Sequence, residues 1–334
     1  MRAAVRMGMA AAFALFCTIP PVAAEPAAQP RTEVPIRRVT LSTGAWRYVV
    51  QIALAGTVMD AGLDSGSTGL RVIGPLPGVR MDGRRTSYGY NVGTRLDGVM
   101  AEAPVSIGEV TGAAPIQAVT GVGCTEEKPH CPAIQVPFSQ YGIQGDGLAG
   151  EGFKAILGLD MAPADVPNPL LKLGVRRWII ELPRPGDAGP GRLILNPTDQ
   201  ELDGFIRFHL TPKPNPRSPL HDAIPACLLN QQTKATICGQ GVLDTGAPGI
   251  RVVTERLQAV WPDGTKGLMA FYDGDKPRTS LAFTVGLHSE ASRMTTEARD
   301  VRMARLFLGV TPYFAYDVLY DADSGEVGLK PRTP

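Results

Sequence analysis

Two aspartates lie in closely matching stretches of the sequence. Leu63–Ile73 reads LDSGSTGLRVI and Leu243–Val253 reads LDTGAPGIRVV, with six of eleven positions identical. Each stretch places one acidic residue, Asp64 or Asp244, between an apolar run and a glycine. Paired carboxylates at a shared site divide the acid and base roles between two residues of one type. The repeat therefore predicts two similar lobes, each supplying one carboxylate.

Each aspartate is expected to end a strand and to open a sharp turn, which Gly66 and Gly246 permit. If the turns meet, the two carboxyl groups share one proton, because like charges at short distance cannot both ionise easily. The ionised member then takes a proton from water while the protonated member polarises a carbonyl, which suits amide hydrolysis. Alternatively, Asp64 and Asp244 merely open turns. Two copies in matched frames favour the catalytic interpretation.

Short apolar or alternating runs, punctuated by Gly, Pro and Asp, predict an all-β fold. Trp178–Leu182 with Arg192–Leu195 is expected to form one hairpin, and Asp317–Tyr320 with Glu326–Leu329 another. A single helix is expected within Pro167–Leu173. These short elements suit the presentation of turns at strand ends.

The N-terminus has the pattern of a secretory signal peptide, residues 1–24. Arg2 and Arg6 precede the apolar stretch Met7–Ile19, and small residues end at Ala24. The apolar stretch is too short to span a bilayer. We therefore expect an exported protein, periplasmic or secreted, with no membrane attachment after signal cleavage.

After 24 residues are removed from 334, the remaining 310 suffice for two domains. A polar stretch around Asn196–Gly204 marks the predicted boundary between an N-terminal lobe, 25–198, and a C-terminal lobe, 199–334. The formal net charge of +1 gives no reason to expect a nucleic-acid partner. We expect a monomer.

Four cysteines follow the predicted signal: Cys124, Cys131, Cys227 and Cys238. An even number in an exported protein indicates disulfides, for which three connectivities are possible. The near-neighbour pairs Cys124–Cys131 and Cys227–Cys238 are favoured. No metal site is expected, because none of the four histidines lies at ligand spacing from another.

The ordered landmarks of the chain resemble the pepsin-like aspartic endopeptidases, which are bilobal and almost entirely β. That family repeats a hydrophobic-hydrophobic-Asp-Thr/Ser-Gly motif in each lobe, followed later by hydrophobic-hydrophobic-Gly. Ile156–Gly158 and Phe307–Gly309 match the later element, and Tyr88-Gly89 is similar to the Tyr-Gly of the substrate-covering flap. The resemblance covers most of the mature chain. It implies two pseudo-twofold-related β-barrel lobes with few short helices.

Carried onto this sequence, the resemblance implies that Asp64 and Asp244 form the catalytic dyad that holds the attacking water. Ser65 and Thr245 would cross-bond the two turns beneath the dyad, and Ser67 would donate its hydroxyl to Asp64. The resemblance further implies a peptide or protein substrate and no cofactor.

Other positions depart from the family pattern. Ala247 replaces the usual Ser/Thr, so Asp244 loses one donor, which should raise the pKa of the pair and make the pH optimum less acidic than pepsin's. Arg71 stands where an aromatic often supports the flap tyrosine, and Arg251 echoes it in the second lobe. We expect both arginines to reach loop carbonyls or carboxylates rather than substrate. Tyr90 rivals Tyr88 as the flap tyrosine.

Lys128, within the Cys124–Cys131 loop, is expected to be a solvated surface residue. The sequence thus predicts an exported aspartic endopeptidase. The alternative is a catalytically silent relative that binds peptides or another protein in the cleft. Because both aspartates are present, the enzyme is favoured.

Overall fold

The computed structural model describes residues 29–210, 223–255 and 260–333. The predicted signal peptide, residues 1–24, lies outside the described residues. Strands dominate, and the helices are short. The first half contributes β1 Thr32–Thr40, β2 Trp46–Leu54, β3 Thr57–Asp64, β4 Thr68–Ile73, β5 Arg85–Gly89, β6 Thr94–Ile107, β7 Val110–Cys124, η1 Pro132–Gln135, η2 Phe138–Gln140, β8 Ala155–Leu159, α1 Pro169–Lys172, β9 Arg177–Glu181 and β10 Gly191–Leu195. The second half contributes β11 Ile206–His209, β12 Ile224–Asn230, β13 Thr236–Val242, β14 Ile250–Thr254, β15 Lys266–Asp273, β16 Lys276–Thr284, η3 His288–Glu290, β17 Met294–Ala298, β18 Ala304–Phe307, α2 Thr311–Ala315, β19 Tyr316–Asp321 and β20 Glu326–Pro331.

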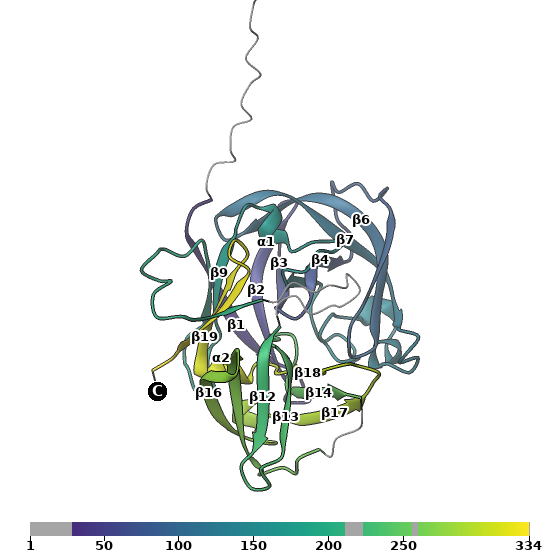
Figure 1. The fold of residues 1–334 in the computed structure, drawn as a ribbon. Coiled ribbons are helices and arrows are strands. Elements are labelled where there is room, and N and C mark those ends of the chain that lie inside the picture. Colours follow the sequence, from purple (N-terminus) through teal and green to yellow (C-terminus); the bar gives the residue numbers. More distant parts are fainter. Residues whose placement is uncertain (1–28, 211–222, 256–259, 334) are drawn as a thin grey trace, which may run out of the picture.

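Two sheets organise these strands (Figure 1). One runs in the order β11-β20-β19-β9-β10-β1-β2-β3-β8-β4-β7-β6-β5, and the other in the order β16-β15-β12-β13-β18-β14-β17. The first sheet joins the two halves of the chain, because β19, drawn in yellow, pairs antiparallel with β9. The halves are therefore connected by a continuous ladder of backbone hydrogen bonds as well as by the chain itself.

The two lobes repeat one local strand arrangement. In the N-terminal lobe β8 lies between β3 and β4, parallel to the first and antiparallel to the second, while β4 also runs parallel to β7. In the C-terminal lobe β18 lies between β13 and β14 with the same two directions, and β14 runs parallel to β17. The sequence repeat is thus matched by a repeat in topology, and the predicted all-β, bilobal architecture is confirmed.

Both predicted hairpins are present. β9 pairs antiparallel with β10, and β19 pairs antiparallel with β20. The Asp321 carboxylate accepts hydrogen bonds from the backbone N–H groups of Asp323 and Ser324 at 3.0 and 3.1 Å, which closes the second hairpin. The predicted helix is a single turn, Pro169–Lys172, whose first turn is capped by the Asn168 side chain. Local sequence preferences therefore suffice to place these elements.

One large hydrophobic core draws on both lobes. It includes Trp178 of β9 and Tyr320 of β19, whose rings stack with centroids 5.6 Å apart. Both side chains are almost completely buried. Because buried apolar area stabilises by about 25 cal/mol per Å², this shared core holds the two lobes in one fixed relation.

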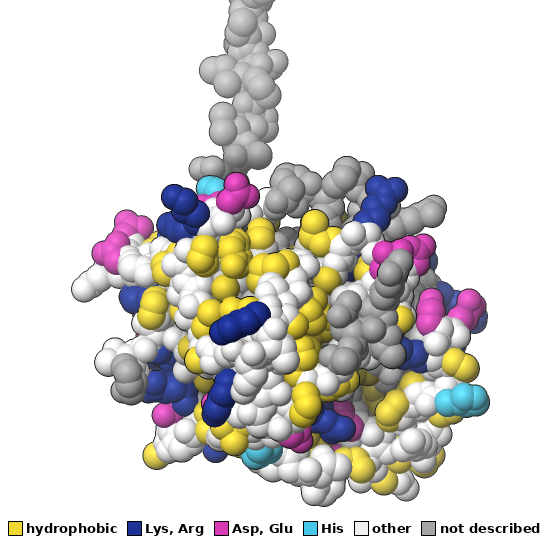
Figure 2. Space-filling model, turned by 60° about the horizontal axis from the view of Figure 1, so that its bottom comes forward, with side chains coloured by type: hydrophobic (Ala, Val, Ile, Leu, Met, Phe, Trp, Pro, Cys, Tyr) yellow, Lys and Arg dark blue, Asp and Glu magenta, His cyan; other side chains and the backbone are white. Residues whose placement is uncertain are grey.

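The surface carries charges of both signs. On the face shown in Figure 2, basic and acidic side chains are interspersed with apolar ones, in keeping with the formal net charge of +1. Across the described ranges, no helix has the length and apolar character needed to cross a bilayer.

Candidate active site

The two aspartates sit at the ends of buried strands, where neighbouring strands fix their backbones. Asp64 is the last residue of β3, and its backbone pairs in register with Gly158 of β8. A side chain at Gly158 would press on the backbone of Thr68, so only glycine allows β8 to pass there. In the second lobe Gly309, whose φ is +60°, accepts a hydrogen bond from the Asp244 N–H at 3.3 Å. Both hydrophobic-hydrophobic-Gly elements thus pack directly against an aspartate turn.

Hydrogen bonds tie the two turns to one another beneath the carboxyl groups. The Ser65 N–H donates to Thr245 Oγ1, and the Thr245 N–H donates to Ser65 Oγ, both at 3.0 Å. The Ser65 hydroxyl also donates to the Leu243 carbonyl at 2.8 Å, and the Thr245 hydroxyl donates to the Leu63 carbonyl at 3.0 Å. These reciprocal, buried bonds fix the spacing of the two aspartates.

Each of the two carboxyl groups lies against the opposite aspartate turn, and the negative charge of Asp64 acts on Asp244. A Cβ atom at Gly66 would lie 2.6 Å from Asp244 Oδ1, and one at Gly246 would lie 2.6 Å from Asp64 Oδ1. Each turn therefore needs glycine because the opposite carboxyl group occupies the space of a side chain. The Gly66 and Gly246 N–H groups also donate to the aspartate of their own turn, at 3.0 and 2.9 Å.

The two aspartates differ in their hydrogen-bond donors. The Ser67 hydroxyl donates to Asp64 Oδ2 at 2.6 Å, whereas the equivalent Ala247 has no hydroxyl. Burial raises the pKa of Asp64, and hydrogen bonds from Ser67, Asp244 and Gly66 with the charge of Arg71 counteract that rise. Burial raises the pKa of Asp244 further, aided by the adjacent negative charge of Asp64. The favoured arrangement has Asp64 ionised and Asp244 protonated.

Two tyrosines near the end of the chain support the turns from below. The Tyr313 hydroxyl lies 2.8 Å from Ser65 Oγ and 2.7 Å from the Tyr320 hydroxyl, and the two tyrosine oxygens lie 3.3 and 3.4 Å from the Leu243 carbonyl oxygen. Neither tyrosine is predicted as a site residue by the sequence. No local motif marks them, because Tyr313 contacts Ser65 from 248 residues away and Tyr320 contacts Leu243 from 77 residues away.

Tyr88, at the end of the β5–β6 hairpin, lies against the N-terminal aspartate turn. Its hydroxyl is 3.5 Å from the Thr68 backbone nitrogen. The Arg71 guanidinium sits over the Tyr88 ring, 3.5 Å from its centroid, and also donates to the Thr68 carbonyl. Arg71 is only 2% exposed. Its guanidinium therefore reaches a backbone carbonyl at the start of β4, rather than one in a loop, and supports Tyr88 by a cation–π contact.

Tyr90 occupies a different environment in the same hairpin. Its ring packs on the apolar cluster that contains Ile73, Leu96 and Ile156. Its hydroxyl is buried without a hydrogen-bond partner among the described residues, and burial raises its pKa. A buried hydroxyl without a hydrogen-bond partner lowers the stability of the folded protein by about 1–3 kcal/mol. This cost would disappear if the hairpin lifted and exposed the Tyr90 hydroxyl to water.

Structural comparison identifies the architecture. The aspartic proteinase from Irpex lacteus superposes with a TM-score of 0.61 at 12% identity, over 91% of this chain and 98% of that chain. The chain has the pepsin-like aspartic proteinase fold. No protein-family model and no curated protein sequence matches the chain. At this identity, the likeness is one of fold.

Within this pepsin-like fold, the disulfides join near neighbours, Cys124–Cys131 and Cys227–Cys238. The first closes the loop on which the hairpin turn rests, where the Thr125 N–H donates to the Gly93 carbonyl at 2.7 Å. The second links directly opposed positions of β12 and β13. Among the described residues, no group of three or more His, Cys, Asp or Glu side chains gathers to hold a metal ion.

The contacts of Lys128 differ from those expected from the sequence, which predicts a solvated surface residue. Its Nζ donates to the Asn91 carbonyl at 2.9 Å and pairs with Glu297 at 3.0 Å, so it links the disulfide loop to the hairpin turn and to the other lobe. Lys128 is therefore an interlobe contact that stays partly exposed, and not merely a solvated surface residue. The sequence could not reveal this because Glu297 lies 169 residues away.

A groove of about 510 Å³ runs between the lobes of the pepsin-like fold. Trp46 and Asp146 line it from the N-terminal lobe, and Pro248 and His288 from the C-terminal lobe. The rings of Trp46 and His288 lie 4.3 Å apart. Because Pro248 is only four residues beyond Asp244, the groove begins beside the C-terminal aspartate turn.

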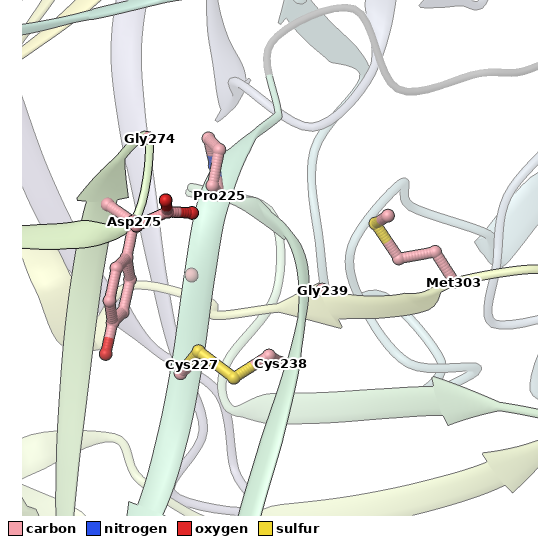
Figure 3. Close-up of a pocket in the computed structure, with 9 residues that line it drawn as sticks. Pro225, Cys227, Cys238, Gly239, Gly274, Asp275 and Met303 are labelled. Atoms are coloured by element: carbon pink, nitrogen blue, oxygen red, sulfur yellow. A yellow bond between two sulfur atoms is a disulfide. The ribbon is translucent and has the colours of Figure 1, made fainter.

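A second hollow of about 370 Å³ lies on the C-terminal lobe beside the Cys227–Cys238 disulfide (Figure 3). Pro225 and Asp275 line it on one side of the disulfide, and Met303 lies on the other. Its lining comes from β12, β13, the β15–β16 turn and Met303. This hollow is therefore separate from the two aspartate turns.

Proposed function

We propose that this protein is an aspartic endopeptidase that hydrolyses peptide bonds with a water molecule activated between Asp64 and Asp244. The observation that carries the proposal is the close approach of the two carboxyl groups, each packed against the glycine of the opposite turn and held above reciprocally bonded turns. A pair used only to open turns would need neither the contact nor the glycines that make room for it.

The asymmetry of the pair assigns a role to each member. The Asp64 carboxylate takes a proton from the water as its oxygen adds to the peptide carbonyl carbon, and Asp244 gives its proton to the carbonyl oxygen. When the C–N bond breaks, the leaving nitrogen takes the proton held by Asp64, and the new hydroxyl returns one to Asp244. Proton balance is restored without a covalent intermediate.

The pH range of activity follows from the same roles. Activity requires pH values at which Asp64 is ionised and Asp244 is still protonated. Because burial and the Asp64 charge raise the pKa of Asp244, the alkaline limit lies higher than for an ordinary carboxyl pair. We infer an optimum less acidic than that of pepsin.

Export and an extended peptide substrate complete the proposal. The signal-like segment 1–24 supports export, and so do two disulfides, which form and persist in oxidising compartments. The interlobe groove beside Pro248 and the hairpin over the dyad suit an extended peptide. The lobes would be 25–198 and 199–334.

The test is cleavage of a peptide library by the purified protein across pH, with and without pepstatin. Asp64→Asn and Asp244→Asn should each lower kcat/KM by at least about 10³-fold, because each removes one proton-transfer group while keeping the shape. Exposed Asp82→Asn serves as the matched control.

Cleavage that persists in Asp64→Asn would rule out the dyad mechanism. Peptide binding without cleavage by the wild-type protein would favour the silent, peptide-binding alternative instead.

A further inference from the structure

The turn of the β5–β6 hairpin is attached to both lobes. The Asn91 carbonyl accepts from Lys128 Nζ at 2.9 Å and from Arg251 Nη1 at 2.8 Å. Lys128 belongs to the N-terminal disulfide loop, whereas Arg251 belongs to β14 of the C-terminal lobe. A single backbone carbonyl thus connects the hairpin tip to cations from opposite sides of the cleft.

These cations form a cluster around one acid. Glu297 of β17 pairs with Lys128 at 3.0 Å, with Arg251 at 2.5 Å and with Arg299 at 2.5 Å. We call Lys128, Arg251, Arg299 and Glu297 the flap-tip cluster. Its three cations and one anion leave an excess of two positive charges.

Neighbouring charges do not remove that excess. Arg305 lies close enough to Arg299 for their charges to interact, and exposed Glu127 interacts with Arg299 from the disulfide loop. Adding one cation and one anion keeps the excess at two. The side chains are also within reach of solvent, with 31% of Lys128 and 17% of Arg251 exposed. A ligand could therefore approach them.

The cluster lies close to the dyad. Arg251 follows Asp244 by seven residues on β14, the strand that leaves the aspartate turn, and the negative charge shared by the aspartate pair acts on Arg251. An extended peptide rises by about 3.3 Å per residue, so we expect a substrate side chain a few residues from the cleaved bond to reach Arg251.

Lifting the hairpin to admit a peptide would remove the Asn91 carbonyl from both cations. Arg251 and Lys128 would then each lose one acceptor and keep their pairing with Glu297, in a region that already carries excess positive charge. A carboxylate fits this vacancy better than a neutral group, because charge-assisted hydrogen bonds to guanidinium and ammonium groups are the strongest of their kind.

We propose that the flap-tip cluster selects substrates with an Asp or Glu side chain near the cleaved bond, whose carboxylate replaces the Asn91 carbonyl as acceptor for Arg251 and Lys128. This inference rests on the proposed peptidase function. It gives Arg251 a substrate contact in addition to the loop carbonyl and carboxylate that it reaches in the closed hairpin.

The test uses one cleavable peptide with Gln at the flanking positions, each replaced in turn by Glu or Lys. At one position the Glu peptide should have a kcat/KM about tenfold above that of the Gln peptide, and added salt should reduce this advantage. The ratio should fall close to one in the double variant Arg251→Gln/Lys128→Gln. Arg176→Gln, which removes an exposed cation paired with Asp323, should keep it.

A second variant should strengthen the preference for the Glu peptide without removing a cation from the cluster. Glu297→Gln raises the excess from two positive charges to three, so the Glu-to-Gln ratio should increase. An unchanged ratio in both Glu297→Gln and the double variant, or a wild-type preference for Gln or Lys at every position, overturns the inference.

Failure of the inference can be distinguished from failure of the proposed function. If wild-type protein cleaves no peptide, the proposed function fails, and fluorescence anisotropy then measures binding of the same peptides to the wild-type and double-variant proteins. Tighter binding of a Glu peptide that is lost in the double variant supports the inference. Equal affinities for Glu and Gln peptides overturn it.

Discussion

The N-terminal aspartate turn gives its carboxyl group one more side-chain donor than the C-terminal turn does. Ser67 donates to Asp64 at 2.6 Å, whereas Ala247 offers Asp244 only its backbone N–H. The strands, glycines and cross-bonds around the two turns are otherwise equivalent. The missing hydroxyl, together with the charge of Arg71 near Asp64, therefore favours ionisation of Asp64 over Asp244.

The arginines at equivalent positions of the two motifs differ even more. Arg71 is buried under Tyr88 within its own lobe, while Arg251 reaches out of its lobe to the Asn91 carbonyl and Glu297. One arginine thus supports the hairpin from below and the other holds its tip. The two arginines occupy equivalent motif positions but make different contacts, because different residues lie next to them in the two lobes.

Among the variants that test how the two aspartate turns differ, Arg71→Met is expected to change activity the most. This change removes the cation–π contact with Tyr88 and a positive charge that lowers the pKa of Asp64. We expect kcat/KM to fall about tenfold and the acidic limb of the pH–rate profile to move to higher pH. Methionine keeps most of the volume, so thermal unfolding should change little.

Arg251→Met is the matched control from the other lobe. It should leave the acidic limb in place, because Arg251 does not act on Asp64. Equal shifts of that limb in both variants would show that the two arginines are interchangeable.

The reciprocal pair Ser67→Ala and Ala247→Ser tests the donor asymmetry directly. Losing the Ser67 hydroxyl raises the pKa of Asp64 and should move the acidic limb up by about one pH unit. One unit of pKa corresponds to about the free energy of one hydrogen bond. Adding a hydroxyl beside Asp244 stabilises its ionised form and should move the alkaline limb down by a similar amount. Profiles of kcat/KM from pH 3 to 8 measure both; movement of the opposite limb in either variant contradicts the assigned roles.

The smallest expected effect is on the thermal stability of the protein. The native pKa of Asp244 is raised, so the native state binds more protons than the unfolded state, and stability falls as pH rises through the native pKa. Asp244→Asn removes this loss. It should raise Tm at pH 7 by a few degrees, at about 1.4 kcal/mol per unit of pKa shift, with little change near pH 3.

Asp64→Asn is the comparison for that measurement and should give a smaller gain, since three hydrogen bonds and Arg71 already favour its charged form. Calorimetry at both pH values provides the readout. A lower Tm for Asp244→Asn at pH 7 would contradict the direction of the shift.

Much of the fold could be read from local sequence. The hairpins at Trp178–Leu182 and Asp317–Tyr320 follow from alternation and turn residues, and the disulfides follow from near-neighbour spacing. The repeat identified both aspartates. Each of these features depends on residues that are close in the chain or on a motif that is written twice.

Long-range contacts were beyond the reach of the sequence. Tyr313 contacts Ser65 of the first turn across 248 residues of sequence, and Lys128 pairs with Glu297 of the other lobe across 169. Nothing in the spacing of these residues marks them, because such contacts depend on how the lobes pack rather than on local preference.

The sequence by itself determined that there are two aspartate turns, that each opens on a glycine, and that one lacks a hydroxyl donor. The tertiary structure alone decided that the carboxyl groups meet, that Tyr88 rests on Arg71, and that the hairpin tip is tied to the opposite lobe. The physical reason is that turn chemistry is set by adjacent residues. Proton sharing and ion pairing instead depend on distances that only the packing of two lobes around a common core can fix.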